Sequence, residues 1–429
     1  MHRSTGAVPL FSLPSRTVHS DFDGWQELHA DGGCGTPSAP PLARIDDGGI
    51  LLAKGLLHAV GLQEELLERV LNLARATLTP SQFQRLDRKG FESIHTVLTA
   101  AELEKFYLDV REDLAARFPG FVRRMLRHAL PLPERFFINA NTVVRFMVPH
   151  EALHRGYAHF RKHLGKLDLH GPHHDYWQGV ATNAINIWMA LGRVRPGNGL
   201  ALYPHLWGKT LPRGVSHVRD DQYLGTPLVV SCEPGDVVFF HSHHMHGSIL
   251  NHTDETRFVI TGRFTVDEPR HPHRDPARQL DYFDSERVGE TTGAEALIPK
   301  TPLAADASFP ITSVTRAVRE VHAQHELAAL AEGEIAAYGP RHVAVRHAGR
   351  THVLSRFCPH QGADLSLGRL TPDGALVCPW HVHPFDIRTG VGACAMLRLD
   401  CGVSSQPTVD DTARDEVPRP EENDALPKS

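Results

Sequence analysis

Residues 235–266 read GDVVFFHSHHMHGSILNHTDETRFVITGRFTV and carry the clearest β pattern in the chain. Two short runs rich in β-branched and aromatic residues, GDVVFF and TRFVITGRFTV, flank a histidine-rich segment that contains turn residues. Similar runs stand earlier as NTVVRFMV, TNAINIWMAL and TPLVVSC, separated by Gly, Pro, Asn and Asp. Many short strands broken by turns predict a β core built from two sheets.

A helical pattern precedes this β core. Between residues 50 and 130, segments such as LLHAVGLQEELLERVLNLARATL repeat apolar residues at i, i+3, i+4 and i+7. Short strands resume near residue 335 with EIAAYG, HVAVRHAG and THVLSRF. The sequence therefore predicts an α+β, mainly β protein, in which a helical layer comes before the large β core and a small all-β unit follows it.

Composition along the chain predicts the domain boundaries. The start mixes Gly, Pro and Ser without a lasting apolar period, a middle stretch is rich in Pro, Arg and Asp, and the end is a Pro/Glu/Asp tail. We expect a flexible leader at 1–46, the helical layer and β core at 47–275, a linker at 276–312, the small β domain at 313–405 and a disordered tail at 406–429.

Charge and cysteine content restrict the possible partners. The 45 Lys and Arg against 50 Asp and Glu leave a net charge of −5, without a dense basic run, so we expect no nucleic-acid partner. The first twenty residues lack the apolar stretch of a signal peptide, and no segment reaches the roughly 20 apolar residues of a membrane span. Six cysteines in 429 residues are too sparse for a disulfide framework. We expect a cytoplasmic protein without a membrane partner.

The most specific motif is FCPHQGADLSLGRLTPDGALVCPWHVHPFDIRTG at 357–390, in which C-P-H is followed after seventeen residues by C-P-W-H. A Rieske [2Fe–2S] cluster needs two Cys on one iron and two His on the other. The predicted cluster ligands are therefore Cys358, His360, Cys378 and His381. A structural zinc site would favour C-x2-C or H-x3-H pairs instead.

The region around this motif, at about 320–405, resembles the Rieske ferredoxin domain of bacterial ring-hydroxylating systems. The likeness extends to the G-A-D-L-S-L-G and P-F-D-I-R-T-G elements. One position departs from the family pattern, because Val382 stands where the family usually has Gly after the second His. This departure concerns the turn rather than the ligands.

A second histidine-rich pattern predicts a mononuclear iron site. Two His and one carboxylate on one face of an iron are the ligand set of non-haem Fe(II) oxygenases. His173 and Asp175 form H-x-D, so on a strand they would point to the same side, and His246 is the candidate for the third ligand. Other histidines compete for these positions: His174 for that of His173, and His241, His243 or His244 for that of His246. We expect the unused ones to be supporting or surface groups.

The segment at about 135–265 resembles the phytanoyl-CoA dioxygenase family of Fe(II)/2-oxoglutarate oxygenases. It contains H-H-D, a Trp-containing strand INIWMAL, a P-G-N-G-L turn, E-P-G-D-V-V-F-F and an H-G-S…N…R ending. The resemblance implies a double-stranded β-helix, the jelly-roll or cupin-like fold, and iron bound by His173, Asp175 and His246. It also implies that Arg257 and Ser248 bind the distal carboxylate of 2-oxoglutarate and that Trp188 walls its pocket.

Together the two motifs predict a dioxygenase that uses Fe(II), 2-oxoglutarate and O2 and carries a fused Rieske electron-transfer domain. The expected substrate is a small metabolite, with hydroxylation as the outcome and a natural-product intermediate as one candidate. The expected partner is a ferredoxin or flavin reductase. Two alternatives stay open: a Rieske-fed iron oxygenase that needs an external reductase but no 2-oxoglutarate, and an electron carrier or redox sensor with an inactive front domain.

Overall fold

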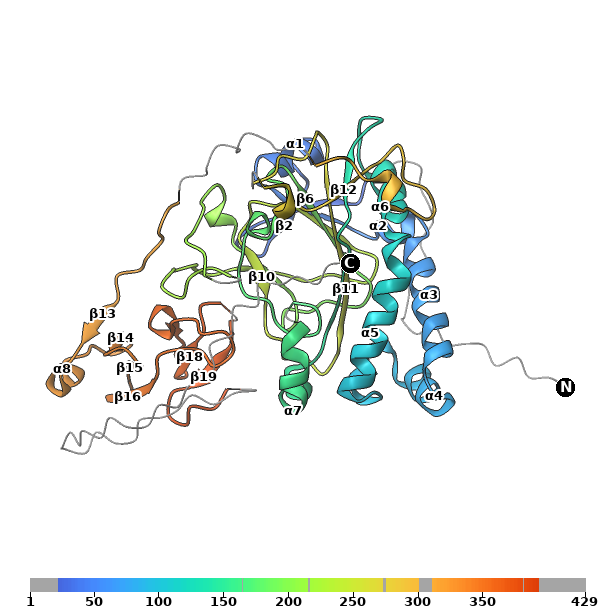
Figure 1. Cartoon of the computed structure of the whole chain (residues 1–429). Coiled ribbons are helices and arrows are strands. Elements are labelled where there is room, and N and C mark those ends of the chain that lie inside the picture. Colours follow the sequence, from blue (N-terminus) through green and yellow to red (C-terminus); the bar gives the residue numbers. More distant parts are fainter. Residues whose placement is uncertain are drawn as a thin grey trace.

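The structure is a computed structural model that describes residues 22–392, apart from 164, 215–216, 273–274, 301–310 and 381. Figure 1 shows a large β core covered on one side by helices, with a smaller β domain, coloured orange to red, against its opposite side. The predicted fold class, a jelly-roll-like sheet with N-terminal helices followed by a small β domain, is confirmed.

The β core contains two antiparallel sheets. The larger has nine strands in the order β12-β4-β11-β6-β9-β3-β1-β2, with β5 paired to β11, and the smaller has the order β10-β7-β8. The strands of the core are β1 (Trp25–Leu28), β2 (Cys34–Gly35), β3 (Ile50–Ala53), β4 (Phe137–Asn139), β5 (Val143–Met147), β6 (Ile185–Ala190), β7 (Leu200–Leu202), β8 (Leu228–Val230), β9 (Val237–His241), β10 (His246–Ser248), β11 (Arg257–Thr265) and β12 (Tyr282–Asp284).

Strand alternation gives the large sheet two different faces. On β11, Phe258 and Ile260 pack under the helices, whereas Val259, between them, packs toward the smaller sheet. On β6, Ile187 faces the helices and Trp188 faces inward. The central strands are therefore buried on both sides, and the space between the sheets can hold a site.

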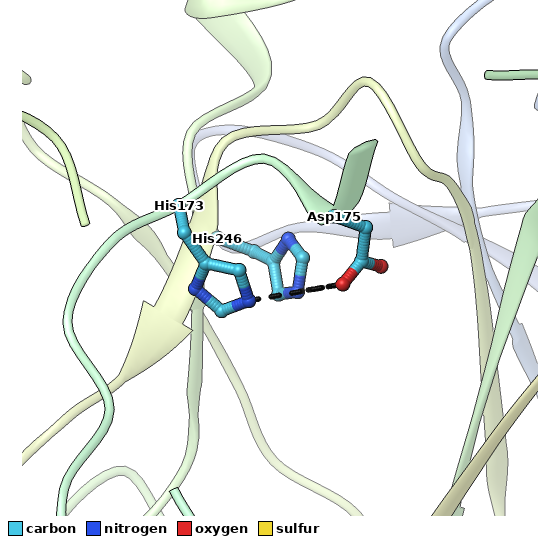
Figure 2. A group of neighbouring side chains, drawn as sticks. All are labelled: His173, Asp175 and His246. Atoms are coloured by element: carbon cyan, nitrogen blue, oxygen red, sulfur yellow. Dashed lines mark ion pairs between the residues drawn. The ribbon is translucent and has the colours of Figure 1, made fainter. Parts of the chain in front are cut away.

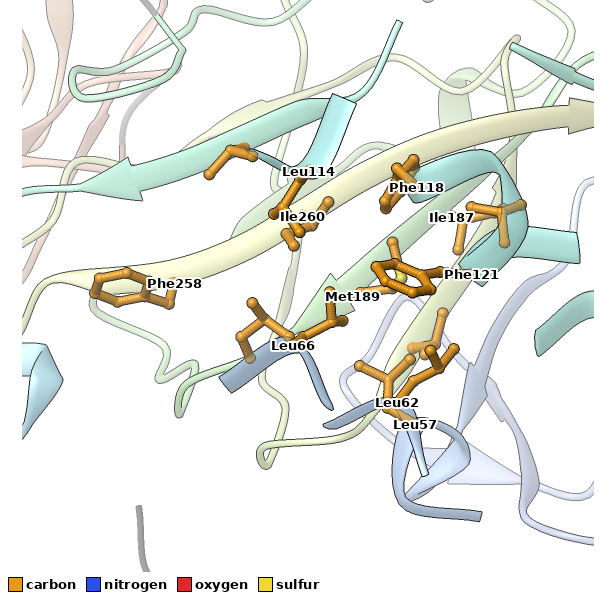
Figure 3. Close-up of a cluster of buried hydrophobic side chains, with 14 of the residues drawn as sticks. Leu57, Leu62, Leu66, Leu114, Phe118, Phe121, Ile187, Met189, Phe258 and Ile260 are labelled. Carbon is orange, nitrogen blue, oxygen red and sulfur yellow. The ribbon is translucent and has the colours of Figure 1, made fainter. Parts of the chain in front are cut away.

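The predicted helical layer covers the outer face of the large sheet and consists of α2 (Leu56–Ala59), α3 (Leu62–Thr77), α4 (Pro80–Lys89), α5 (Ala100–Ala115) and α6 (Phe118–Ala129). Two further helices, α1 (Pro41–Asp46) and α7 (His150–Phe160), lie outside the stretch predicted to be helical. Thr79 and Thr99 begin α4 and α5 with capping boxes that satisfy free backbone N–H groups. Figure 3 shows Leu66 and Phe121 from the helices packed on Met189 of the sheet. Each such buried side chain contributes roughly 1.5–3 kcal/mol.

Two segments differ from the predicted boundaries. Residues 25–46 of the expected leader contain β1, β2 and α1, and β1 pairs with β3 along four residues. In the expected linker, β12 adds to the large sheet beside β4. Their short strands have little periodicity of their own and are stabilised by pairing with the finished sheet, which explains why composition predicted irregular segments there. The expected tail lies outside the described residues.

Among its described residues, the C-terminal domain contains two further sheets and one short α-helix. Its elements are β13 (Arg319–Val321), α8 (Gln324–Ala328), β14 (Ile335–Tyr338), β15 (His342–His347), β16 (Arg350–Ser355), β17 (Arg369–Leu370), β18 (Ala375–Val377) and β19 (Pro384–Asp386). β13–β16 form one sheet and β17–β19 the other. One buried hydrophobic cluster spans this domain and the β core, with Val343 and Trp380 on one side and Met245 on the other.

Within the described residues, no helix combines the length and the apolar character needed to cross a membrane.

Candidate metal centres

The structure brings His173, Asp175 and His246 together. One ligand atom from each lies within 4.8 Å of the others, and all three residues are buried. Asp175 Oδ1 lies 3.7 Å from His173 Nε2 and 3.9 Å from His246 Nε2. Figure 2 shows the two imidazole rings and the carboxylate pointing toward one another. Two imidazoles and one carboxylate at these distances fit a divalent iron ion that keeps open positions.

Backbone pairing places the two histidines. The His173 N–H donates to the His246 carbonyl at 2.8 Å, and the His246 N–H donates to the His173 carbonyl at 3.1 Å. Asp175 does not continue this bridge but begins a short 3₁₀ helix, Asp175–Gln178. The argument that His173 and Asp175 share one side of a strand is therefore wrong, although the two side chains converge.

A buried arginine fixes the carboxylate instead. Arg263 Nε and Nη2 donate to the two oxygens of Asp175 at 3.1 and 2.7 Å. Burial alone would raise the pKa of Asp175, but the charge of Arg263 and its hydrogen bonds outweigh it, so this pKa lies well below its usual range. Asp175 is thus ionised and pre-oriented for a cation.

The outer nitrogens of both imidazoles face backbone carbonyls. His173 Nδ1 lies 2.8 Å from the Gly171 carbonyl, and His246 Nδ1 lies 3.0 Å from the His244 carbonyl. These contacts select the tautomer with the proton on Nδ1 and leave Nε2 as a ligand atom. Burial, with the nearby His173, lowers the pKa of His246 to about 3, so this imidazole is neutral, as a metal ligand requires.

The competing histidines lie outside this group of three. His174 is buried and stacks on Tyr176 at a ring-centroid distance of 5.0 Å. The other three surround Trp207: His241, His243 and His244 have ring centroids 5.3, 6.2 and 4.7 Å from it. They pack in the protein rather than forming an exposed patch, and His244 supports His246 through its carbonyl.

A narrow cavity opens beside the triad, between the two sheets. Its lining is Arg145, His170, His173, Asn186, Ile187, Trp188, Leu200, Phe240, His246, Gly247, Ser248, Arg257, Thr261 and Arg263. Three of these residues are arginines and none is acidic. Two buried donors, Arg257 Nε and Asn186 Nδ2, have no hydrogen-bond partner within the described part of the chain. Unpaired buried donors next to an excess of positive charge fit an anionic ligand.

The three residues predicted to bind the cosubstrate all line this cavity. Arg257 donates from Nη1 to the carbonyls of Asn198 and Gly199 at 2.6 and 2.8 Å, and its guanidinium lies 5.5 Å from the Trp188 ring centroid. Burial, followed by the charge of Arg145, lowers the pKa of Arg257 to about 9. Its positive charge would therefore be stabilised by a negative ligand. Ser248 lies on β10.

Sequence reasoning missed Arg145, Asn186 and Arg263. A signal for Arg263 was present, because it stands six residues after Arg257 in the apolar strand β11, and even spacing places both on one face of a sheet. Asn186 stands two residues before Trp188 on β6, so this pair also lies on one face of the sheet. Arg145 gives no comparable signal, because its place at the cavity depends on how β5 pairs with β11.

Three of the predicted cluster ligands, Cys358, His360 and Cys378, lie in two loops of the C-terminal domain. Cys358 and Cys378 are 2% and 1% exposed, so both thiols are protected from solvent as cluster ligands must be. Cys358 Sγ lies 3.2 Å from His360 Nδ1 in the first loop. In the second loop, the Cys378 N–H donates to the His383 carbonyl. His381 lies outside the described residues.

The backbone of the second loop explains why the Rieske family usually has glycine at the position of Val382. Val382 has φ +55°, in the left-handed region, and its N–H donates to the Cys378 carbonyl. A β-branched residue is strained in this conformation, and glycine is not. The loop therefore keeps a backbone shape suited to glycine although it carries valine.

Two family profiles match this chain. The profile of phytanoyl-CoA dioxygenase (PhyH) matches residues 45–259, half of the chain, and the profile of the Rieske [2Fe-2S] domain matches residues 318–398. The protein is a non-haem iron oxygenase with an H-x-D…H triad, fused to a Rieske ferredoxin domain. It belongs to the phytanoyl-CoA dioxygenase (PhyH) family.

Individual relatives match parts of the chain. The ferredoxin component of the alkene monooxygenase system of Xanthobacter autotrophicus (strain ATCC BAA-1158 / Py2) is 44% identical over 48 residues, which are 11% of this chain and 39% of that protein. The chain thus spans about two fifths of the length of this curated relative. The ferredoxin of carbazole 1,9a-dioxygenase from Nocardioides aromaticivorans IC177 is similar at 26% identity and TM-score 0.16, over 17% of this chain and 78% of that one.

A larger share of the chain is similar to a solved structure of an epimerase. The non-haem alpha-ketoglutarate-dependent epimerase SnoN from nogalamycin biosynthesis matches at 18% identity and TM-score 0.30, over 62% of this chain and 94% of that chain.

Proposed function

We propose that this protein is an Fe(II)/2-oxoglutarate-dependent dioxygenase that hydroxylates a small metabolite. The observation that carries the proposal is the cavity beside the triad, with three arginines, no acidic side chain and two unpaired buried donors. 2-Oxoglutarate is a dianion at neutral pH, and burying it requires such a positive, hydrogen-bonding environment. A natural-product intermediate is a candidate substrate, since SnoN, a structural relative, comes from nogalamycin biosynthesis.

In this proposal each residue has a definite role. His173, Asp175 and His246 hold Fe(II), and Arg263 keeps the Asp175 carboxylate in place. Arg257 binds the distal carboxylate of 2-oxoglutarate, because a guanidinium can pair with a carboxylate through two N–H groups. Ser248 adds a hydroxyl donor and Trp188 forms a wall. When bound, the iron supplies the site at which O2 is activated.

The Rieske domain has a supporting role in this proposal. Oxidative decarboxylation of 2-oxoglutarate supplies two of the four electrons that O2 accepts, and the substrate supplies the other two. Ordinary turnover therefore needs no external electron. The cluster would return the mononuclear iron to Fe(II) after uncoupled cycles have left it as Fe(III), and a ferredoxin or flavin reductase would recharge the cluster.

The proposal is tested without turnover by adding 2-oxoglutarate to the anaerobic Fe(II)-loaded protein. We expect a weak visible charge-transfer band that is lost in Arg257→Ala. The matched control is Arg195→Ala, which removes a more exposed arginine paired with Glu255 at 3.2 Å and should keep the band. Substrate screening by succinate formation would then identify the substrate class.

Other results would contradict the proposal. Turnover that required NADH and a reductase but ignored 2-oxoglutarate would identify a Rieske-fed oxygenase. Absence of both the band and iron binding at the triad, with an intact cluster, would identify an electron carrier or redox sensor.

A further inference from the structure

The ligand loop of the Rieske domain contacts the segment that leads to the iron triad. Gln361 Nε2 donates to the Leu169 carbonyl at 3.0 Å. Gln361 directly follows the cluster ligand His360, and Leu169 lies four residues before the triad ligand His173. This hydrogen bond therefore joins the surroundings of the two iron sites.

The contact continues to the triad through one more residue. His170 follows Leu169, and its ring centroid lies 4.2 Å from that of His173. The Ser248 N–H donates to the His170 carbonyl at 2.9 Å, which ties this segment to β10. The path from His360 to His173 thus consists of two peptide links, one hydrogen bond and one ring contact.

The Gln361 side chain packs closely against the segment that contains Leu169 and Gly171. Gly171 faces Gln361, and a Cβ at Gly171 would lie only 2.5 Å from Gln361 Oε1, so a larger residue at position 171 would push the Gln361 side chain aside. His360 itself has a ring contact with His150 at 5.0 Å. Cys358 and Cys378, from the two loops that would bind the [2Fe–2S] cluster, also belong to the group of buried hydrophobic residues shared with the β core. The hydrogen bond of Gln361 therefore places the first ligand loop of the Rieske domain against the segment that precedes the triad. Figure 1 shows β18 and β19 of this domain to the lower left of β10.

We propose that an electron passes from the cluster to the mononuclear iron within one chain, and that Gln361 is the positioning residue for this transfer. The inference rests on the proposed function because it needs both iron sites. In the step, the reduced cluster loses one electron and the mononuclear Fe(III) gains it to become Fe(II). A ferredoxin or flavin reductase supplies the electron that reduces the cluster again, and no bond is made or broken.

A second contact offers a competing path. The Tyr203 hydroxyl donates to the Trp380 carbonyl at 3.4 Å, and the Tyr203 N–H donates to the carbonyl of Met245, next to His246. We favour Gln361 because its hydrogen bond, at 3.0 Å, is shorter than the 3.4 Å of the Tyr203 contact. The Tyr203→Phe variant separates the two paths.

The test follows one electron in the full-length holoprotein with the mononuclear iron oxidised. Photoreduction under anaerobic conditions reduces the cluster by one electron. Optical and EPR spectra then record the reoxidation of the cluster and the loss of the signal of the mononuclear Fe(III). We expect a first-order rate constant that does not change with protein concentration. Gln361→Leu should lower it by about tenfold or more, since such steps depend on ångström-scale placement, while the cluster EPR signal stays unchanged.

The matched control is Gln222→Leu. Gln222 is a buried glutamine that accepts from the Val314 N–H at 3.0 Å, a contact of the same kind that touches neither ligand segment. The Gln222→Leu variant should keep the wild-type rate constant of electron transfer. Tyr203→Phe should reduce this rate constant less than Gln361→Leu does.

Three results would overturn the inference: a rate proportional to protein concentration, an unchanged rate in Gln361→Leu, or an equal or larger loss in Tyr203→Phe or Gln222→Leu. Transfer with these properties in a protein that gives no 2-oxoglutarate band would contradict the proposed function alone. A normal band with transfer between chains would contradict this inference alone.

Discussion

The two metal centres of this protein are built in different ways. The triad takes ligands that stand up to 73 positions apart, all within the β core, and a buried ion pair between Arg263 and Asp175 orients its carboxylate. The cluster loops take ligands from one short stretch and are shaped by backbone hydrogen bonds such as that from Gly362 to Cys358. Phe357, at the start of this stretch, is 40% exposed.

This difference implies different sensitivities. A site positioned by buried charge should respond strongly to loss of a charged partner and to pH, because an unpaired buried charge is costly. A site positioned by turns should respond to backbone preference and to loss of its own ligands. The two centres should therefore be separable by single substitutions, each of which affects one site and spares the other.

The largest expected effect is in the cluster loops. Cys358→Ser should abolish the reduced-state EPR signal of the cluster, because a thiolate ligand is lost. The charge-transfer band with 2-oxoglutarate at the triad should remain. Cys232→Ser, at a buried cysteine of the β core, is the control and should keep the EPR signal. Simultaneous loss of both signals in Cys358→Ser would show that the centres are not independent.

The next effect concerns the buried ion pair. Arg263→Leu leaves the Asp175 carboxylate buried without its partner, which should lower the free energy of unfolding of the metal-free protein by about 3–5 kcal/mol. Urea denaturation measures this change. Arg388→Leu removes an exposed partner of Asp386 and should lower the free energy of unfolding far less, because water screens an exposed ion pair. Equal losses in the two variants would refute the account of how the triad carboxylate is held.

The difference between a local motif and a site assembled from distant strands also explains which site residues could be predicted from the sequence. The proposed Rieske ligands follow a local motif, so the Rieske domain could be predicted before the fold was known, and Cys358 and Cys378 remain its predicted cysteine ligands. The triad was also predictable in outline, through H-x-D and a distant histidine. Arg145 could not be found, because its place at the cavity depends on strand pairing between residues more than a hundred positions apart.

Local irregularity accounts for the remaining differences. The 3₁₀ helix at Asp175 breaks the period of a strand, so the correct residue was chosen for the wrong geometric reason. Strands β1 and β12 are short and gain their stability from the sheet they join, so composition alone assigned them to a leader and a linker.

A smaller effect is expected from pH. Burial, with the nearby His243, lowers the pKa of His241 to about 3, whereas the unfolded chain takes up a proton near pH 6.5. The unfolded state therefore binds more protons as the pH falls below 6.5, and stability decreases by up to about 1.4 kcal/mol at pH 5.5 for this residue. Urea denaturation of the wild type and of His241→Phe at pH 7.5 and 5.5 measures this change in the free energy of unfolding. Identical pH dependence in both would contradict this assignment.

The smallest effect lies in the second cluster loop. Val382→Gly should raise the free energy of unfolding by about 1 kcal/mol, because glycine accepts the left-handed conformation without strain. Val391→Gly, at an exposed valine without a positive φ, should instead lower it by about 0.5–1 kcal/mol. Thermal denaturation of the cluster-loaded protein compares them. Destabilisation by Val382→Gly would contradict the described turn.

The most direct test of two iron centres in one chain is Mössbauer spectroscopy of anaerobic protein loaded with iron-57, compared between wild type and Asp175→Ala. We predict that wild type shows the two irons of the [2Fe–2S] cluster together with one high-spin Fe(II) site, and that Asp175→Ala loses only the high-spin component. A wild-type spectrum without the mononuclear site, or one that Asp175→Ala leaves unchanged, would contradict the account.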